Sequence, residues 1–181
     1  MNKIGNKFSG KVKIAAVLIL LFISIPIIWP AAAGARGVSE GDFTVTLTVR
    51  ADTLIDNPLL DPDKRELVPE DGVIFQATEV NANEGDSVFD VLLREMQRAR
   101  IHMEFSRTTA LQTAYVMGIN NLYEFDAGPL SGWKYKVNGE FPNFGSSQYF
   151  LGPEDEIQWL FTTDLGRDID GFMPDGGQWG R

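Results

Sequence analysis

Few side chains in this sequence could act as nucleophiles or bases. The chain has no cysteine and one histidine, His102. A thiolate nucleophile, a Cys-ligated zinc site and a disulfide framework are therefore excluded, and no G-x-S-x-G sequence marks a nucleophilic serine. His102 falls on the polar side of a predicted strand, where a surface role is typical. No spacing among the 25 acidic residues indicates a pair for glycoside hydrolysis. We therefore predict a protein without catalytic residues.

Acidic residues near the C-terminus suggest metal binding at first sight. Asp164, Asp168 and Asp170-Gly171 form a D-x-x-x-D-x-D-G string, and Asp61 and Asp63 lie in a long loop. Carboxylate oxygens suit calcium, but neither string has the EF-hand spacing or its bidentate Glu. We interpret both strings as solvated acidic turns and assign no metal ligand.

Aromatic residues gather in a loop late in the chain. Phe141, Phe144 and Tyr149 lie among small and polar residues, namely Pro142, Asn143, Gly145, Ser146 and Ser147. Rings beside small polar groups are typical of a contact surface. A loop folded back over a sheet edge would have the same composition, so both interpretations remain open.

Two strands are expected to carry this loop. Trp133, Tyr135 and Val137 alternate with Lys134 and Lys136, which is the period of a half-buried strand. The same alternation returns in residues 156–161, with Ile157, Trp159 and Phe161 on one face. Asn138-Gly139 favours a type I′ turn, whereas Phe141-Pro142 favours a wider connection.

One helix is predicted from its capping residues and its apolar period. Asp86 or Ser87 can accept from the first free N–H groups, and Asp90 adds negative charge to the first turn. The apolar residues recur at spacings of three and four and should face the sheet; they are Val88, Phe89, Leu92, Leu93 and Met96. A basic cluster, Arg94, Arg98 and Arg100, matches the dipole at the C-terminal end.

Further strands are predicted over residues 43–50, 73–80, 101–105 and 114–119, and a polar, proline-rich loop separates the first two. Strands, one helix and then more strands indicate an α+β fold. Among such folds we expect a β-grasp-like mixed sheet with one helix packed across a face. The domain is expected to span residues 43–168, after a linker at 36–42 and before a flexible tail at 169–181.

The charge distribution limits the partners. The chain has 16 basic and 25 acidic residues, and four of the basic ones precede residue 14. The remaining chain therefore carries 12 basic against 25 acidic residues. This excess of negative charge argues against nucleic-acid binding, because no basic patch would offset phosphate repulsion.

The N-terminus resembles an export signal. Four lysines precede an apolar run at residues 14–29, and the small residues 31–35 offer A-x-A-like cleavage sites. The 16-residue run is longer than a usual signal core and shorter than the roughly 20 residues of a typical membrane span. Residues 1–35 are thus a signal peptide or a membrane anchor helix, and we expect the domain to be extracellular or at the cell surface.

Several ordered motifs resemble one known family. They are E-G-D-S-V-F-D-V-L-L, A-Y-V-M-G-I-N-N-L-Y-E-F-D-A-G-P-L, S-G-W-K-Y-K-V-N-G and I-Q-W-L-F-T-T-D-L-G-R-D. They are similar to the bacterial transcobalamin-like C-terminal domains, a family of unknown function that itself resembles the β-domain of transcobalamin and intrinsic factor. The resemblance covers residues 43–168. It specifies the fold better than the activity.

The resemblance implies a ligand site. In the animal carriers, cobalamin lies between a helical domain and the β-domain. Carried over by motif, the ligand-binding residues here would be Trp133, Lys134, Tyr135, Ser146, Ser147 and Tyr149. The expected function is an exported, non-catalytic module that binds cobalamin or a related corrinoid together with a partner such as a membrane uptake component. The competing interpretation is a cell-surface module that recognises protein or polysaccharide without a small-molecule ligand.

Overall fold

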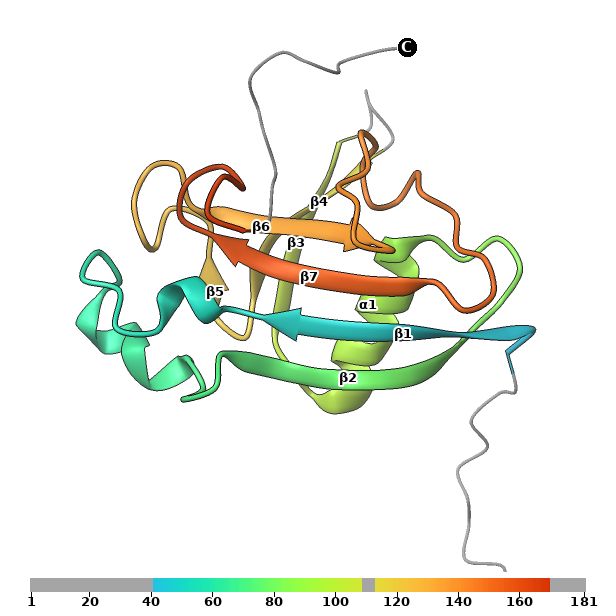
Figure 1. Ribbon diagram of the computed structural model, residues 1–181, viewed down its shortest axis with the longest axis horizontal. Coiled ribbons are helices and arrows are strands. Elements are labelled where there is room, and N and C mark those ends of the chain that lie inside the picture. Colours follow the sequence, from blue (N-terminus) through green and yellow to red (C-terminus); the bar gives the residue numbers. More distant parts are fainter. Residues whose placement is uncertain (1–40, 109–112, 170–181) are drawn as a thin grey trace, which may run out of the picture. The chain divides into compact units, whose positions relative to one another are not determined.

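The computed structural model describes residues 41–108 and 113–169 (Figure 1). These residues belong to one compact unit, Gly37–Arg181. The predicted signal or anchor segment and the predicted tail from residue 170 onward lie outside the described residues. Within the described ranges, no helix is long and apolar enough to cross a membrane.

A four-stranded sheet forms the larger layer of the unit. It consists of β1 (Phe43–Arg50), β2 (Val73–Ala82), β6 (Gly132–Val137) and β7 (Glu156–Thr162), in the order β2-β1-β7-β6 (Figure 1). β1 pairs antiparallel with β2 and parallel with β7, and β6 pairs antiparallel with β7. The expected α+β class and mixed sheet are therefore confirmed.

The hairpin between β6 and β7 combines a tight turn with a long excursion. Asn138 and Gly139 have φ angles of 52° and 81°, and Val137 and Glu140 exchange two backbone hydrogen bonds of 3.0 Å. This is the turn that Asn-Gly favours. The chain then leaves the sheet at Phe141 and rejoins it at Glu156, as Phe141-Pro142 predicted.

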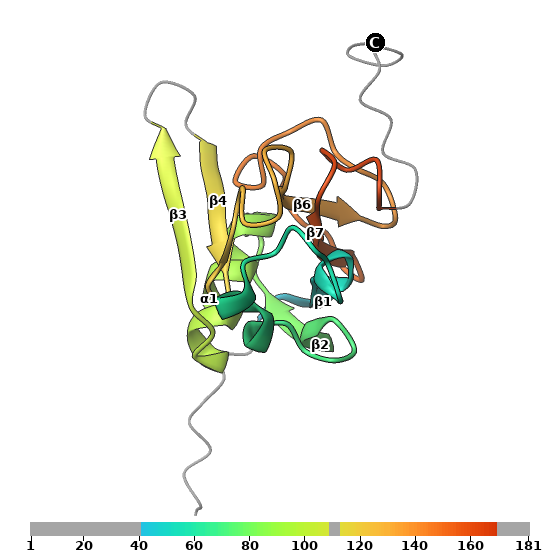
Figure 2. The same cartoon turned by 90° about the vertical axis from the view of Figure 1, so that its left-hand side faces the viewer.

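Helix α1 (Val88–Ala99) begins at a capping box. The hydroxyl of Ser87 accepts from the N–H of Asp90, and the carboxylate of Asp90 accepts from the N–H of Ser87. Val88, Phe89, Leu92 and Met96 are buried as predicted, while Leu93 is only partly buried. Figure 2 shows that α1 and the next two strands along the chain lie on one side of the four-stranded sheet.

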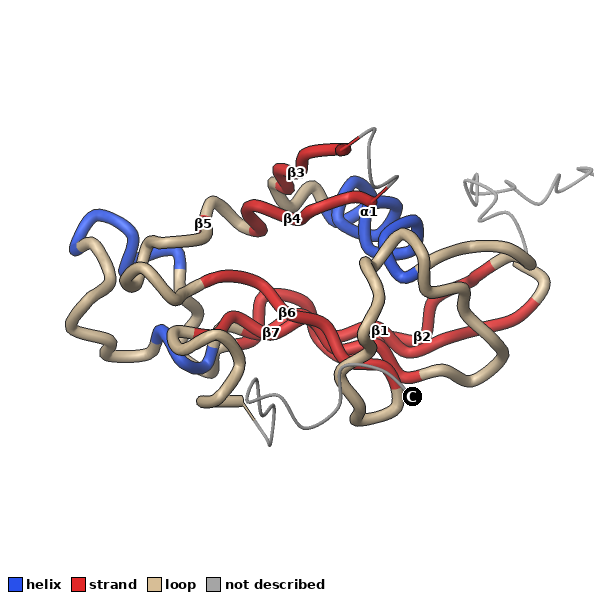
Figure 3. The backbone as a smooth tube through the Cα atoms, turned by 90° about the horizontal axis from the view of Figure 1, so that it is seen from above, coloured by secondary structure: helices blue, strands red, loops and turns tan. Residues whose placement is uncertain are grey.

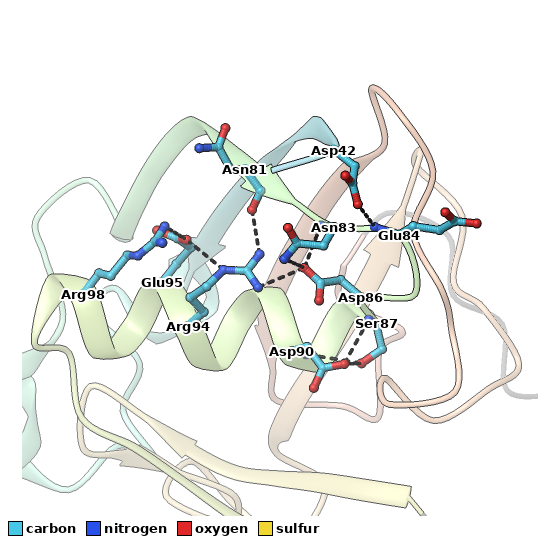
Figure 4. A network of polar contacts seen from close by, with 10 residues as sticks. All are labelled: Asp42, Asn81, Asn83, Glu84, Asp86, Ser87, Asp90, Arg94, Glu95 and Arg98. Carbon is cyan, nitrogen blue, oxygen red and sulfur yellow. Dashed lines mark hydrogen bonds and ion pairs between the residues drawn. The ribbon is translucent and has the colours of Figure 1, made fainter. Parts of the chain in front are cut away.

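A polar network joins the N-terminal end of α1 to the strands β1 and β2 (Figure 4). Arg94 donates to Asp86 Oδ2 at 2.9 Å and to the carbonyl oxygen of Asn81 at 2.6 Å. Arg94 was expected to serve the C-terminal end of the helix dipole, but its guanidinium reaches toward the N-terminal loop. It thereby ties the helix to the end of β2.

The three strands directly after the helix form a separate small sheet, seen beside α1 in Figure 3. It contains β3 (Met103–Thr108), β4 (Thr113–Ile119) and β5 (Leu122–Tyr123), in that order. Phe105 of β3 packs edge-on against Phe89 of α1, with ring centroids 4.9 Å apart. The helix, the small sheet and the inner face of the large sheet thus share one apolar core.

The long loop between β1 and β2 is less irregular than its composition indicated. It contains two short 3₁₀ helices, η1 (Asp52–Leu54) and η2 (Pro62–Leu67). Leu54 and Leu60 are buried, and the hydroxyl of Thr53 donates to the carbonyl of Phe161 at 2.7 Å. The loop is therefore packed against the end of β7.

Candidate ligand-binding face

Residues 141–150, the aromatic loop, are held against the start of α1. The N–H groups of Val88 and Phe89 donate to the carbonyls of Tyr149 and Ser146, each at 3.0 Å. These N–H groups belong to the first turn of the helix, where no intrahelical partner exists. The loop therefore completes the hydrogen bonding of the helix N-terminus, and its own position is fixed in return.

The same loop is also attached to both sheets. The hydroxyl of Tyr135 in β6 donates to the carbonyl of Phe144 at 2.8 Å, and the N–H of Ala114 in β4 donates to Ser147 Oγ at 2.9 Å. A methyl group on Gly145 would lie only 2.9 Å from Thr113 Cγ2. The loop thus joins α1, β4 and β6, which come from three separate parts of the chain.

Two of the predicted ligand-binding residues lie in the core. Trp133 is 7% exposed, packs edge-on against Phe161 at 5.2 Å, and donates its Nε1–H to the carbonyl of Leu122 at 2.9 Å. Tyr135 is 9% exposed and lies 5.4 Å from the ring of Trp159. Burial raises the pKa of the Tyr135 hydroxyl. Tyr135 reaches the aromatic loop through its hydroxyl, whereas the indole of Trp133 is bonded to Leu122 of β5.

The other four predicted residues are distributed around the loop. Ser146 is buried, Ser147 and Tyr149 are partly buried, and Tyr149 lies 6.5 Å from Tyr135 between ring centroids. Lys134 occupies the opposite face of β6 from Trp133 and Tyr135, and burial lowers the pKa of its amine. The structure therefore brings Tyr135, Ser146, Ser147 and Tyr149 together and places Lys134 on the other side of the sheet.

The exposed rings of this region include Phe144, which is 64% exposed, Phe150, which is 66% exposed, and Tyr115, which is 50% exposed. Phe144 precedes Gly145, and Tyr115 follows Ala114, so both flank the junction between β4 and the aromatic loop. Phe144 was among the loop residues singled out from the sequence. Tyr115 was missed, although its place in A-Y-V-M, between residues on the buried face, marks it as outward-facing.

Tyr115 is held by a neighbouring carboxylate. Its hydroxyl donates to Glu124. Burial, and then this hydrogen bond and the charge of Glu124, raise the pKa of Tyr115 to about 12. The ring is therefore neutral at ordinary pH and fixed in orientation, as suits a surface on which a ligand could stack.

The acidic strings serve as turn caps. Asp168 accepts from the hydroxyls of Thr162 and Thr163, and Asp164 pairs with Arg167. Asp61 accepts from the N–H of Asp63 at 3.0 Å, whereas Asp170 lies outside the described residues. Across residues 41–108 and 113–169, no group of three potential ligands is placed to hold a metal ion. His102 is exposed, with its Nε2 lying 2.9 Å from the Tyr123 hydroxyl.

Comparisons with known proteins agree with this architecture. A family model described as a domain of unknown function, DUF4430, matches residues 85–163. No curated protein matches the sequence. Haptocorrin, in a crystal structure with Cbi, is similar at 14% identity with a TM-score of 0.50, over 68% of this chain and 25% of haptocorrin. A Ruminococcus gnavus protein to which metal binding has been attributed gives a TM-score of 0.42 at 13% identity, over 67% of this chain and 97% of that protein.

The chain spans about a quarter of the length of haptocorrin. At 14% identity, this similarity shows a shared fold and does not identify a ligand. The described residues thus have a transcobalamin-like fold, on which the aromatic loop and β4 present the candidate face.

Proposed function

We propose that this protein is an exported, non-catalytic ligand-binding module of the β-grasp type, and that its ligand is cobalamin or a related corrinoid. The proposal rests on the way the aromatic loop is held. Its attachments to α1, β4 and β6 hold Phe144 exposed beside β4. A rigid surface loses little conformational freedom when a ligand binds. The fold similarity to haptocorrin, which was crystallised with Cbi, supports a corrinoid as the first ligand to test.

In this proposal the six residues inferred from the sequence have different roles. Ser147 and Tyr149 are partly exposed and would contact the ligand together with Phe144 and Tyr115. Tyr135 and Ser146 are buried and hold the aromatic loop in place, whereas Trp133 belongs to the core. Lys134 lies across the sheet, so any contribution from it would be to a second partner.

A single face is expected to bind weakly, because good small-molecule sites enclose most of their ligand. In this proposal a partner polypeptide supplies the opposite wall of an enclosed site. A membrane uptake component would fit this role. The module would then deliver or receive the ligand at the cell surface.

Isothermal titration calorimetry of the full chain with cobalamin tests the proposal. We expect saturable heat, and its loss in the double variant Phe144→Ala, Tyr115→Ala. Both rings are at least half exposed, so this variant should stay folded. Leu59→Ala is the matched control, because Leu59 is 66% exposed and lies in the loop between β1 and β2, which packs against the end of β7.

The design avoids Trp133→Ala, since truncating a buried Trp costs about 3–5 kcal/mol of stability and would confuse binding with unfolding. A dissociation constant of about 1 mM corresponds to a binding free energy of only about 4 kcal/mol. If no heat is seen up to that cobalamin concentration, a corrinoid ligand is ruled out. The exposed rings of Phe144 and Tyr115 would then favour the second function, recognition of protein or polysaccharide at the cell surface. Corrinoid-transport genes beside this gene would favour the first function, and adhesion genes the second.

A further inference from the structure

Four large apolar side chains are exposed together at the end of the unit away from the aromatic loop. They are Leu59 at 66%, Phe125 at 62%, Leu165 at 43% and Leu130 at 39% exposure, and we call them the apolar end. Three loops contribute to it, between β1 and β2, between β5 and β6, and after β7. Exposed apolar patches of this kind mark sites of interaction.

Backbone contacts hold the three loops together. The N–H groups of Phe125 and Leu165 donate to the carbonyls of the adjacent residues Ser131 and Leu130, at 3.1 and 2.9 Å. A methyl group on Gly128 would lie 3.5 Å from Leu59 Cδ1, so the Leu59 side chain rests on this backbone. The four exposed residues therefore lie on loops that are held close together.

Two of these residues have unfavourable backbone conformations. Phe125 and Leu165 have φ angles of 71° and 53°, in the left-handed region. The other six non-glycine residues with positive φ among the described residues are Asp, Asn, Arg or Glu. Large apolar residues are rare there, and strain of this kind is concentrated at functional sites. Neither burial nor backbone preference explains why apolar side chains stand at these two positions.

The surroundings of the apolar end are strongly acidic. The three loops, residues 51–72, 124–131 and 163–169, contain 11 acidic and three basic residues. Two of the three bases are already paired with acids of these loops, Lys64 with Asp126 at 2.6 Å and Arg167 with Asp164. A partner with basic groups around an apolar centre would complement this surface.

We propose that the apolar end is a docking site for a basic amphipathic polypeptide segment of a partner protein. Such a segment would place apolar side chains on Phe125, Leu165, Leu130 and Leu59, and Lys or Arg side chains against the acidic rim. An anionic membrane surface or a second copy of this acidic chain would be repelled by the same rim. The proposal does not require a corrinoid. β6 separates the apolar end from the aromatic loop (Figure 1), although Glu124 of the acidic loops also bonds Tyr115.

The test uses a fluorescein-labelled 20-residue peptide of Leu and Lys at amphipathic helical spacing, titrated with the full chain as purified from expressing cells. We expect saturable fluorescence anisotropy that weakens as salt rises, and at least ten-fold weaker binding by the double variant Phe125→Asn, Leu165→Asn. Asn tolerates the left-handed conformation, so the melting temperature should stay equal or rise. Asp56→Asn with Glu66→Gln should weaken binding mainly at low salt.

Phe150→Asn is the matched control, because Phe150 is 66% exposed but belongs to the aromatic loop, where its backbone pairs with Ser87. It should bind the peptide as the parent does. Equal binding of a peptide with the same composition in scrambled order, or an unchanged affinity in the Phe125→Asn, Leu165→Asn variant, would overturn the proposal. If the parent binds phosphatidylglycerol vesicles and does not bind the peptide, the proposed docking site is instead a membrane-binding surface. Cobalamin titrations are unaffected by either result, so failure here is distinguishable from failure of the corrinoid site.

Discussion

At the scale of single residues, the aromatic side chains of this protein divide into a buried set and an exposed set. The Trp133 indole and the Tyr135 hydroxyl both donate to backbone carbonyls and are buried. Phe144 has no polar atom to satisfy and is exposed. The alternation of a strand identifies the buried set, but it contains no information on which loop ring is exposed, because that depends on where the loop is attached.

Tyr115 offers a prediction about pH. Burial and the hydrogen bond to Glu124 raise its pKa to about 12, above the ordinary value of about 10. Because the folded state favours the protonated phenol, the stabilising contribution is complete below about pH 10 and is lost as pH rises from 10 toward 12. An ultraviolet titration of the parent should show one tyrosine, absent in Tyr115→Phe, that ionises near pH 12.

Glu124→Gln is the control for this assignment. Removing the carboxylate charge should move the pKa of Tyr115 back toward the ordinary value, while the burial contribution persists. A tyrosine titration that is identical in Glu124→Gln and the parent would show that Glu124 does not contact this hydroxyl.

At the scale of elements, the local signals in the sequence predicted what is local in the structure. The first strand coincides with β1, the Asn-Gly turn has its expected φ angles, and Ser87 caps α1. Separation of β3, β4 and β5 into a second sheet could not be predicted, because it depends on packing between distant segments such as Phe89 with Phe105. The attachment of the aromatic loop to the helix N-terminus is equally non-local, since its hydrogen bonds join residues about 60 positions apart.

The helix register leads to a second prediction. Leu92 is fully buried between α1 and the sheets, so Leu92→Asp places a charge in the core without a partner. This should cost several kcal/mol of unfolding free energy, which is a large part of the stability of a domain of this size. Thermal melts followed by circular dichroism provide the measurement.

Gln97→Asp is the matched control, because Gln97 is an exposed residue of the same helix. It should lower the melting temperature only slightly, through the unfavourable charge near the helix C-terminus. Similar melting temperatures for Leu92→Asp and the parent would mean that the face assigned to the core is wrong.

At the scale of the whole molecule, the two candidate surfaces lie at opposite ends of the β6 and β7 strands (Figure 1). The aromatic loop closes one end and the apolar end the other, with the shared core between them. A module of this form could hold a ligand and a protein partner at the same time. The acidic character of the chain would direct basic partners to the apolar end while leaving the aromatic face, where neutral rings dominate, for a bulky ligand.

Both proposed functions require the domain to be outside the cell, and this provides the last prediction. Four lysines precede the apolar run at residues 14–29, and positive charge ahead of such a run retains the N-terminus in the cytoplasm. The remainder of the chain should then be translocated. In a bacterial host expressing the full chain, protease added to intact protoplasts should remove the domain from the cell fraction, or the domain should be found in the medium. A cytoplasmic protein expressed in the same cells serves as the control and must stay intact.

Mass spectrometry of the mature N-terminus then separates the two forms, since cleavage at the small residues 31–35 releases the domain, whereas an intact Met1 together with membrane fractionation indicates an anchor. A full-length protein that is protected from protease until the protoplasts are lysed would contradict export, and with it both surface functions.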